Sequence, residues 1–181
     1  MKQSIALFLV GITLYSCKPP EARYPISNTS GSFIKESAER NLRLNKLEYL
    51  RIQKIIDADT TNSYLTSANG FWYYYNTKIE GDSITAKFGD IINFDYNIKD
   101  LNNKTIYTKA ELKTVNYAMD QQELFTGLRE GLKLMKSGET VTFLFPSQKG
   151  FGYYGDENKI GTNIPLKCEV TVNKITQKKT N

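Results

Sequence analysis

The sequence contains no histidine, and this absence excludes several kinds of enzyme. A Ser-His or Cys-His nucleophile pair, a histidine-ligated zinc ion and an imidazole general base all require that side chain. Carboxylate clusters at metal-ligand spacing and phosphate-binding loops are missing as well. The glycines of Gly150–Gly155 have a dinucleotide-motif spacing, but no helical pattern follows them, so we interpret them as a flexible loop. We therefore expect no metal and no cofactor.

Cysteine is scarce, with two residues in a chain of 181. If Cys17 carries a lipid, Cys168 has no disulfide partner. Because Cys168 lies in an alternating strand pattern, we interpret it as a small core residue and not as a nucleophile. The basic excess is modest, 24 Lys and Arg against 19 Asp and Glu. These charges form no stripe with interleaved aromatics, so we expect no nucleic-acid binding.

The N-terminus has the pattern of an export signal. The apolar run Ile5–Leu14 is too short to span a bilayer as a helix but is typical of a signal-peptide core. Leu-Tyr-Ser-Cys, ending at Cys17, resembles a lipobox. We predict a signal peptide over residues 1–16, lipidation of Cys17 and a Pro/Ser-rich tether over 17–32. The protein would then be a cell-envelope lipoprotein of the outer membrane facing the periplasm; an ordinary cleaved signal is the alternative.

A charged segment with recurring apolar residues follows the tether. Its pattern predicts a helix over Phe33–Ile56, capped by Ser32 and ended by Asp57–Asn62, within a helical segment over 33–68. The apolar stripe requires a partner. Three partners remain open: the chain's own sheet or a short second helix over Ser63–Ala68, a second copy of the chain in a homodimer through residues 33–56, and a membrane surface.

Several later segments have the pattern of strands. Apolar or aromatic side chains alternate, or cluster densely, in the segments Gly70–Tyr75, Ile92–Ile98, Thr105–Thr108, Val141–Phe145 and Lys167–Asn173. Alternate aromatic residues of the first would face the core, and the others would pack on the long helix. Pro146 ends the fourth, since proline donates no hydrogen bond to a sheet.

A short helix is predicted between these strands. Thr126 is a suitable N-cap, and Leu128, Leu132 and Met135 recur on one helical face. Gly138 would supply the stop.

The ordered run GLREGLKLMKSGETVTFLFPSQKGFG, then IPLKCEVTVNKI, resembles the C-terminal half of the FKBP-type peptidyl-prolyl cis-trans isomerases. Upstream, GFWYYYNTKIEGDSITAKFGDIINFDYNI is similar to the family's first two strands. The resemblance implies an isomerase domain over residues 70–176. Its fold would be α+β, a twisted antiparallel β-sheet wrapped on a short α-helix and preceded by an N-terminal helical segment. With the lipobox, the chain resembles the gliding-motility-associated isomerase lipoproteins and, more distantly, the macrophage infectivity potentiators.

The implied activity needs neither metal nor nucleophile. Rotation about a peptide bond costs about 18–20 kcal/mol, and an apolar pocket that grips proline can lower that barrier. The resemblance implies an isomerase that assists the folding of exported envelope proteins, including gliding-motility components. Two alternatives remain open: a non-catalytic proline-binding chaperone or binding module that uses the same cleft, and a scaffold lipoprotein whose useful surface is the long helix.

The resemblance also assigns the pocket residue by residue. The catalytic group would be Tyr96, Phe125, Phe151 and Ile160. The substrate-binding group would be Ile106, Tyr107, Val115, Tyr117, Leu124, Leu128 and Cys168. Four of these differ from the family pattern: Tyr107 stands where a carboxylate is usual, Leu128 replaces a tryptophan, Phe151 lacks a tyrosine hydroxyl and Cys168 replaces a phenylalanine. We therefore expect proline binding with slow isomerisation and weak macrolide binding.

Overall fold

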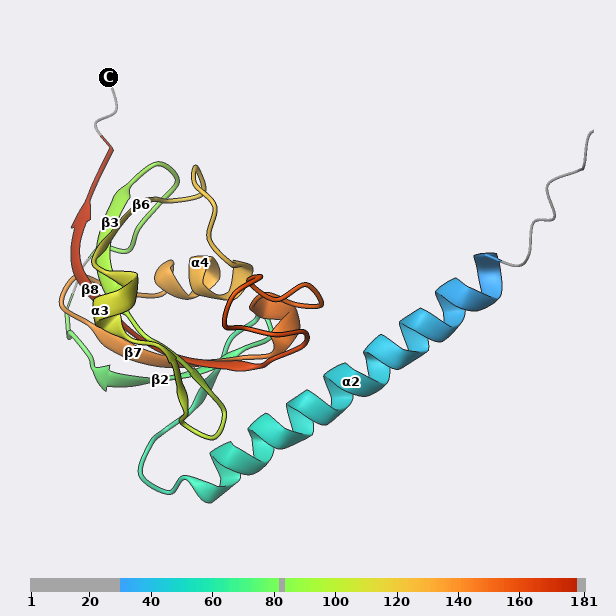
Figure 1. Ribbon diagram of the computed structural model, residues 1–181. Helices are drawn as coiled ribbons and strands as arrows, with labels where there is room; N and C mark the ends of the chain where they lie inside the picture. Colours follow the sequence, from blue (N-terminus) through green and yellow to red (C-terminus); the bar gives the residue numbers. More distant parts are fainter. Residues whose placement is uncertain (1–29, 82–83, 179–181) are drawn as a thin grey trace, which may run out of the picture. The chain divides into compact units, whose positions relative to one another are not determined.

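The computed structural model describes residues 30–81 and 84–178, and an antiparallel sheet curved around a short helix forms its main body (Figure 1). The longest stretch of the sheet runs in the order β1-β2-β7-β8-β3-β6, and β4 pairs with β5 and β8. The strands are β1 (Leu65–Thr66), β2 (Trp72–Thr77), β3 (Ile91–Tyr96), β4 (Ile98–Asp100), β5 (Thr105–Tyr107), β6 (Val115–Ala118), β7 (Thr140–Phe145) and β8 (Leu166–Thr176). The helices are α2 (Ser30–Ala58), α3 (Lys109–Leu112), α4 (Thr126–Leu132) and the 3-10 turn η2 (Ser147–Lys149). This arrangement confirms the α+β prediction with its N-terminal helix.

The C-terminal part of α2 packs on the outer face of the sheet. Ile52 is fully buried in a small apolar cluster with Trp72, Leu101 and Leu144. The Tyr49 ring meets the Trp72 ring edge to face, with 5.0 Å between ring centroids. The chain's own sheet is therefore one partner of the helical stripe, as the first alternative expected. No helix in the described ranges has the length and apolarity needed to cross a membrane.

Two details of this segment differ from the prediction. The helix begins at Ser30, so Ser32 lies inside its first turn and is not the cap. Ser63–Ala68 contains no second helix. Leu65 and Thr66 pair instead with Tyr73 and Trp72 as an edge strand, because that pairing satisfies their backbone groups against β2.

The aromatic strand β2 separates two apolar regions, as its alternation predicted. Phe71, directly before β2, is buried in the main core inside the curve of the sheet, and Tyr73 packs against that core. Trp72 and Tyr74 lie on the opposite face, where Tyr74 meets Tyr64 at a centroid distance of 4.9 Å. Both faces of this strand are therefore largely covered.

The short helix α4 lies inside the curve of the sheet (Figure 1). Leu128, Leu132 and Met135 are fully buried, as predicted. The caps differ: Phe125 is the extended N-cap residue and Thr126 is the first helical residue. The helix ends at Leu132, well before Gly138.

Gly138, with φ of +87°, forms the turn into β7. Its left-handed conformation therefore serves the turn and not the end of the helix.

Two glycines allow α4 to approach β7 closely. A methyl group on Gly127 would lie 2.5 Å from Cδ1 of Phe145, and one on Gly131 would lie 2.9 Å from Cε1 of Phe143. The two phenylalanine rings are stacked at 5.3 Å and fully buried. Moving these close-packed rings would cost free energy, because their neighbours leave no space. The two glycines therefore set the distance between the helix and the sheet.

Candidate functional site

A cavity of about 620 Å³ adjoins the N-terminal end of α4. Its lining residues come from the end of β3, the segment before α4, α4 itself and the loop after η2: Tyr96, Gln122, Glu123, Leu124, Phe125, Arg129 and Phe151. Four of the eleven residues predicted for the pocket therefore line one cavity. Gln122, Glu123 and Arg129 were not predicted.

Aromatic rings form the walls of this cavity. Tyr96 ends β3, with its ring centroid 5.4 Å from that of Phe94. Phe125 precedes α4, and its ring lies 5.1 Å from Phe151 and 5.6 Å from Phe145. Because Phe145 belongs to the core of β7, the rigid sheet supports the cavity wall from behind.

The remaining predicted residues do not line this cavity. Four are buried in the main core: Tyr117, Leu128, Ile160 and Cys168. Three are partly buried and packed against that core: Ile106, Tyr107 and Val115. Ile160 was expected to cap the pocket, yet only 3% of its surface is exposed. The loop pulls it inward, because the carboxylate of Asp156 accepts its backbone N–H at 2.7 Å.

Tyr117 supports the site through its hydroxyl group. This hydroxyl donates to the backbone carbonyl of Gln122 at 3.2 Å. The side-chain oxygen of Gln122 in turn accepts the backbone N–H of Ala118 at 3.1 Å. These bonds fix the segment that leads to Leu124 and Phe125. In this structure Tyr117 positions the cavity wall.

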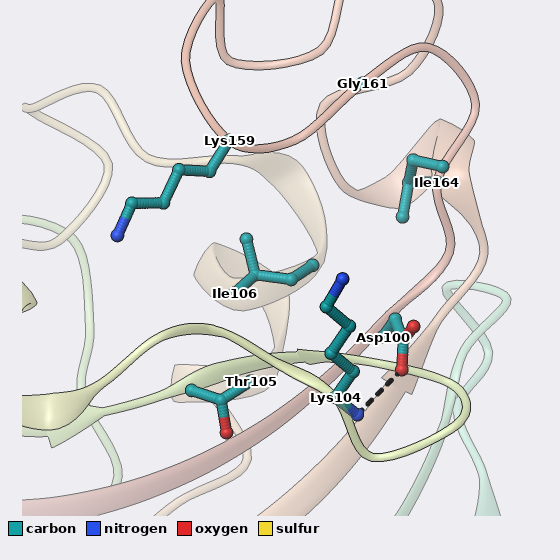
Figure 2. A pocket seen from close by; sticks show the side chains of 7 residues that line it. All are labelled: Asp100, Lys104, Thr105, Ile106, Lys159, Gly161 and Ile164. Atoms are coloured by element: carbon teal, nitrogen blue, oxygen red, sulfur yellow. Dashed lines mark hydrogen bonds between the residues drawn. The ribbon is translucent and has the colours of Figure 1, made fainter.

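Ile106 lines a second cavity of about 470 Å³, between the β4–β5 hairpin and the long loop before β8 (Figure 2). The ammonium group of Lys104 points toward Ile106 and Ile164, whereas the side chain of Lys159 turns away (Figure 2). The carboxylate of Asp100 accepts the backbone N–H of Lys104 at 2.9 Å and so closes the hairpin.

A carboxylate of the loop binds the tyrosine that stands where the strand carboxylate was expected. The hydroxyl of Tyr107 donates to the carboxylate of Asp156. Asp156 also accepts the backbone N–H groups of Asn158 and Ile160, at 3.0 and 2.7 Å. Tyr107, which stands where the resemblance implied a carboxylate, is thus bonded to a carboxylate from the loop. Sequence reasoning missed Asp156, although an aspartate in a loop is a turn signal, because its side chain can accept the backbone N–H two residues later.

A salt bridge holds this loop from its other end. Lys159 pairs with Glu111 of α3, a helix the sequence did not predict, and its ammonium lies 4.8 Å from the centroid of the Tyr107 ring. Thr108 and Glu111 form a capping box that fixes the start of α3. The hydrogen bond from Lys159 and those from Thr108 hold the pKa of Glu111 at about 2.

The ionisable groups of the site keep it uncharged at its centre. Burial raises the pKa of Tyr96, with smaller contributions from Cys168 and Tyr107, so its phenol is neutral at physiological pH. Burial likewise raises the pKa of the fully buried Cys168, which keeps it a thiol and not a nucleophile. Among the described residues, no group of three acidic or cysteine side chains is placed to hold a metal ion. The arrangement suits an uncharged apolar ligand.

A curved antiparallel sheet around a short helix, with an aromatic cavity at the start of that helix, defines an FKBP-like domain. The sequence profile of the family described as FKBP-type peptidyl-prolyl cis-trans isomerase matches residues 82–173, just over half of the chain. The chain therefore belongs to the family of FKBP-type peptidyl-prolyl cis-trans isomerases.

One curated relative comes from Neisseria meningitidis serogroup B and bears the name "Probable FKBP-type peptidyl-prolyl cis-trans isomerase FkpA". It is 28% identical over 110 residues, which cover 61% of this chain and 39% of the relative. The chain thus matches about two fifths of that protein's length.

Two solved structures share the fold. The peptidyl-prolyl cis-trans isomerase of Pseudomonas syringae pv. tomato has a TM-score of 0.59 at 16% identity, over 75% of this chain and 95% of that one. FkpA from Escherichia coli also has a TM-score of 0.59, at 18% identity, over 97% of this chain and 81% of that one. At these identities the likeness concerns the fold alone.

We predict that Asp156→Ala loosens the long loop while the sheet stays folded. Charge-assisted hydrogen bonds contribute about 1.5–3 kcal/mol, so amide exchange of Ile160 should accelerate roughly 10- to 100-fold. Hydrogen exchange read by NMR measures this. Glu157→Ala is the control, since its exposed side chain makes no hydrogen bond within the described residues. Unchanged exchange at Ile160 would contradict the role of Asp156.

The same attachment should depend on pH. Burial acts to raise the pKa of Asp156, but the bonds from Tyr107, Ile160 and Asn158 outweigh it, and the pKa lies below its usual value. The pKa of an aspartate in an unfolded chain is about 3.9. The contribution of Asp156 is therefore complete above that pH and is lost as pH falls through its folded-state pKa.

Proposed function

We propose that this protein catalyses cis-trans isomerisation of X-Pro peptide bonds in the aromatic cavity at the start of α4. The observation that carries the proposal is the cavity itself, which surrounds a neutral tyrosine, Tyr96, with the rings of Phe125 and Phe151. A proline ring is apolar and compact, so such walls can hold it by burial and exclude water. Family membership supports the same reaction.

The cavity offers hydrogen-bond donors for a twisted amide. In the described part of the chain, the backbone N–H of Phe125 makes no hydrogen bond, as is usual at a helix N-terminus. The neutral phenol of Tyr96 is a second donor that lines the cavity. As the X-Pro bond rotates, its carbonyl loses conjugation, and donors fixed in an apolar site can stabilise that state more than the planar one.

The test is isomerisation of a short X-Pro peptide followed by NMR exchange spectroscopy. The wild-type protein should accelerate exchange above the thermal rate. Tyr96→Ala combined with Phe151→Ala should lose about tenfold or more of that acceleration, a barrier change of about 1.4 kcal/mol or more. Tyr96→Phe keeps the ring and removes only the donor, so a smaller loss is expected.

Tyr154→Ala is the matched control, because this loop tyrosine is 84% exposed and does not line the cavity. If the wild type binds the peptide without accelerating exchange, the chain is a binding module or chaperone that uses the same cleft. The substituted positions Tyr107, Leu128 and Cys168 favour that second function.

We further propose that the protein works in the cell envelope, anchored at Cys17 to the outer membrane facing the periplasm, on exported proteins that include motility components. The signal-like run and the lipobox support this address; Cys17 lies outside the described residues. Cys17→Ser should abolish incorporation of labelled fatty acid and release the protein from the membrane fraction. Continued labelling of that variant would refute the anchor.

A homodimer through residues 33–56 is a third proposal. The side chains of Leu47 and Leu50 are 63% and 58% exposed, although α2 uses another face for Ile52. Being three residues apart, they form an apolar pair on the helix surface. Leu47→Glu with Leu50→Glu should convert a dimer to a monomer in sedimentation velocity. Asn41→Glu should not, because this exposed polar residue lies on the other side of the helix from the leucine pair. A wild type that sediments as a monomer at all concentrations would contradict this.

A further inference from the structure

One cationic side chain, Arg129, lines the aromatic cavity. It lies one helical turn after Phe125, since its backbone N–H donates to the Phe125 carbonyl at 3.1 Å. Its side chain is 36% exposed. The guanidinium group therefore sits at the edge of the cavity, beside the backbone that frames the start of α4.

The acidic neighbours of Arg129, Asp120 and Glu130, form their shorter ion pairs with Lys133. Its Nε is 3.7 Å from the nearest carboxylate oxygens of Asp120 and of Glu130, which is beyond hydrogen-bond range. Lys133 approaches the same two carboxylates more closely, at 3.1 and 3.0 Å. Lys133 thus takes the strong contacts, and Arg129 keeps only long ones.

The Nε group of Arg129 is buried and has no hydrogen-bond partner among the described residues. Leaving a buried donor unpaired is unfavourable, and more so for a charged one. Guanidinium also presents five N–H donors in a planar fork that matches a carboxylate in two parallel bonds. Because this Nε is closed off from solvent, a ligand can reach only the Nη groups, which belong to a partly exposed side chain and make no hydrogen bond with the described residues. Their planar pair of N–H groups suits a carboxylate that a ligand supplies.

We propose that Arg129 is a specificity-determining residue that pairs with an aspartate or glutamate side chain beside the proline of the client. This inference rests on the proposed binding of proline-containing segments in the same cavity. Glu123 also lines the cavity and precedes Phe125, whereas Arg129 follows it. Because Glu123 repels a carboxylate on its own side, we expect the preference on one flank of the proline only.

The experiment compares four pairs of blocked hexapeptides that contain a single proline. Each pair varies one of four positions: two residues before the proline, one before, one after or two after. That position is Glu in one peptide and Gln in the other. NMR titration gives the Kd and exchange spectroscopy gives the isomerisation rate. At one flank, Glu should bind about three- to tenfold more tightly than Gln. The Glu-to-Gln ratio should approach one in Arg129→Gln, and it should fall as salt is added.

Arg43→Gln is the charge-matched control. It removes the same charge from an exposed site on α2 outside the cavity, so the ratio should persist. The Gln peptides test the idea without any change to the protein, whatever the variants do to folding. Arg129→Lys keeps the charge but loses the fork, and an intermediate ratio is expected.

Three results would overturn the inference: a ratio of one at all four positions in the wild type, a ratio that survives Arg129→Gln, or equal losses for Glu and Gln peptides. The last result would mean that Arg129 binds a backbone carbonyl of the peptide and not its acidic side chain. Binding preference without accelerated exchange would leave the inference standing and refute the isomerase activity. Accelerated exchange without a preference for Glu would support the isomerase activity and refute the inference. Failure to bind any peptide would refute both the inference and the proposed function.

Discussion

The contact between α4 and β7 determines where the functional cavity lies. Gly127 and Gly131 bring the helix backbone onto the stacked rings of Phe143 and Phe145, closer than any side chain would permit. The segment before the helix is thereby held against the sheet, and Phe125 becomes a wall of the cavity. A larger residue at either glycine would move the helix outward and displace that wall.

The sheet is covered on both faces, which makes this support rigid. Its inner face packs on α4, and part of its outer face packs on the C-terminal portion of α2 through Ile52. Hydrogen bonds add to this contact, because the Glu48 carboxylate accepts the backbone N–H and the hydroxyl of Ser147 at 2.8 and 2.7 Å. Ser147 opens the turn that leads to Phe151. The long helix is thus connected to the loop that carries part of the cavity.

The site separates an uncharged centre from a charged edge. Burial keeps Tyr96 neutral, while Arg129 and Glu123 lie at the rim with opposite charges. The centre suits the proline ring that all clients share, and the rim suits the residues in which clients differ. The hydrogen bond between Tyr107 and Asp156 attaches the loop to the strand, although Tyr107 stands where the resemblance implied a carboxylate.

Local patterns determined much of the fold. The alternation of apolar and polar side chains predicted β8 and the two faces of β2, because every second residue of a strand faces the same side. The apolar spacing predicted the buried face of α4, because every third to fourth residue of a helix faces the same side. Resemblance brought together Tyr96, Leu124, Phe125 and Phe151, which line one cavity. Helix ends were predicted less well.

The start of α4 depends on the tertiary structure. Thr126 is a sound cap as an isolated residue, yet Phe125 is the N-cap, and its ring packs on Phe145 of β7 and on Phe151. Tertiary structure alone decided that Asp156 supplies a carboxylate to Tyr107, since residues far apart in the chain meet there only after the loop folds back. It also decided that Lys133 leaves the side chain of Arg129 without a hydrogen-bond partner among the described residues, because that outcome depends on distances between side chains and not on their order.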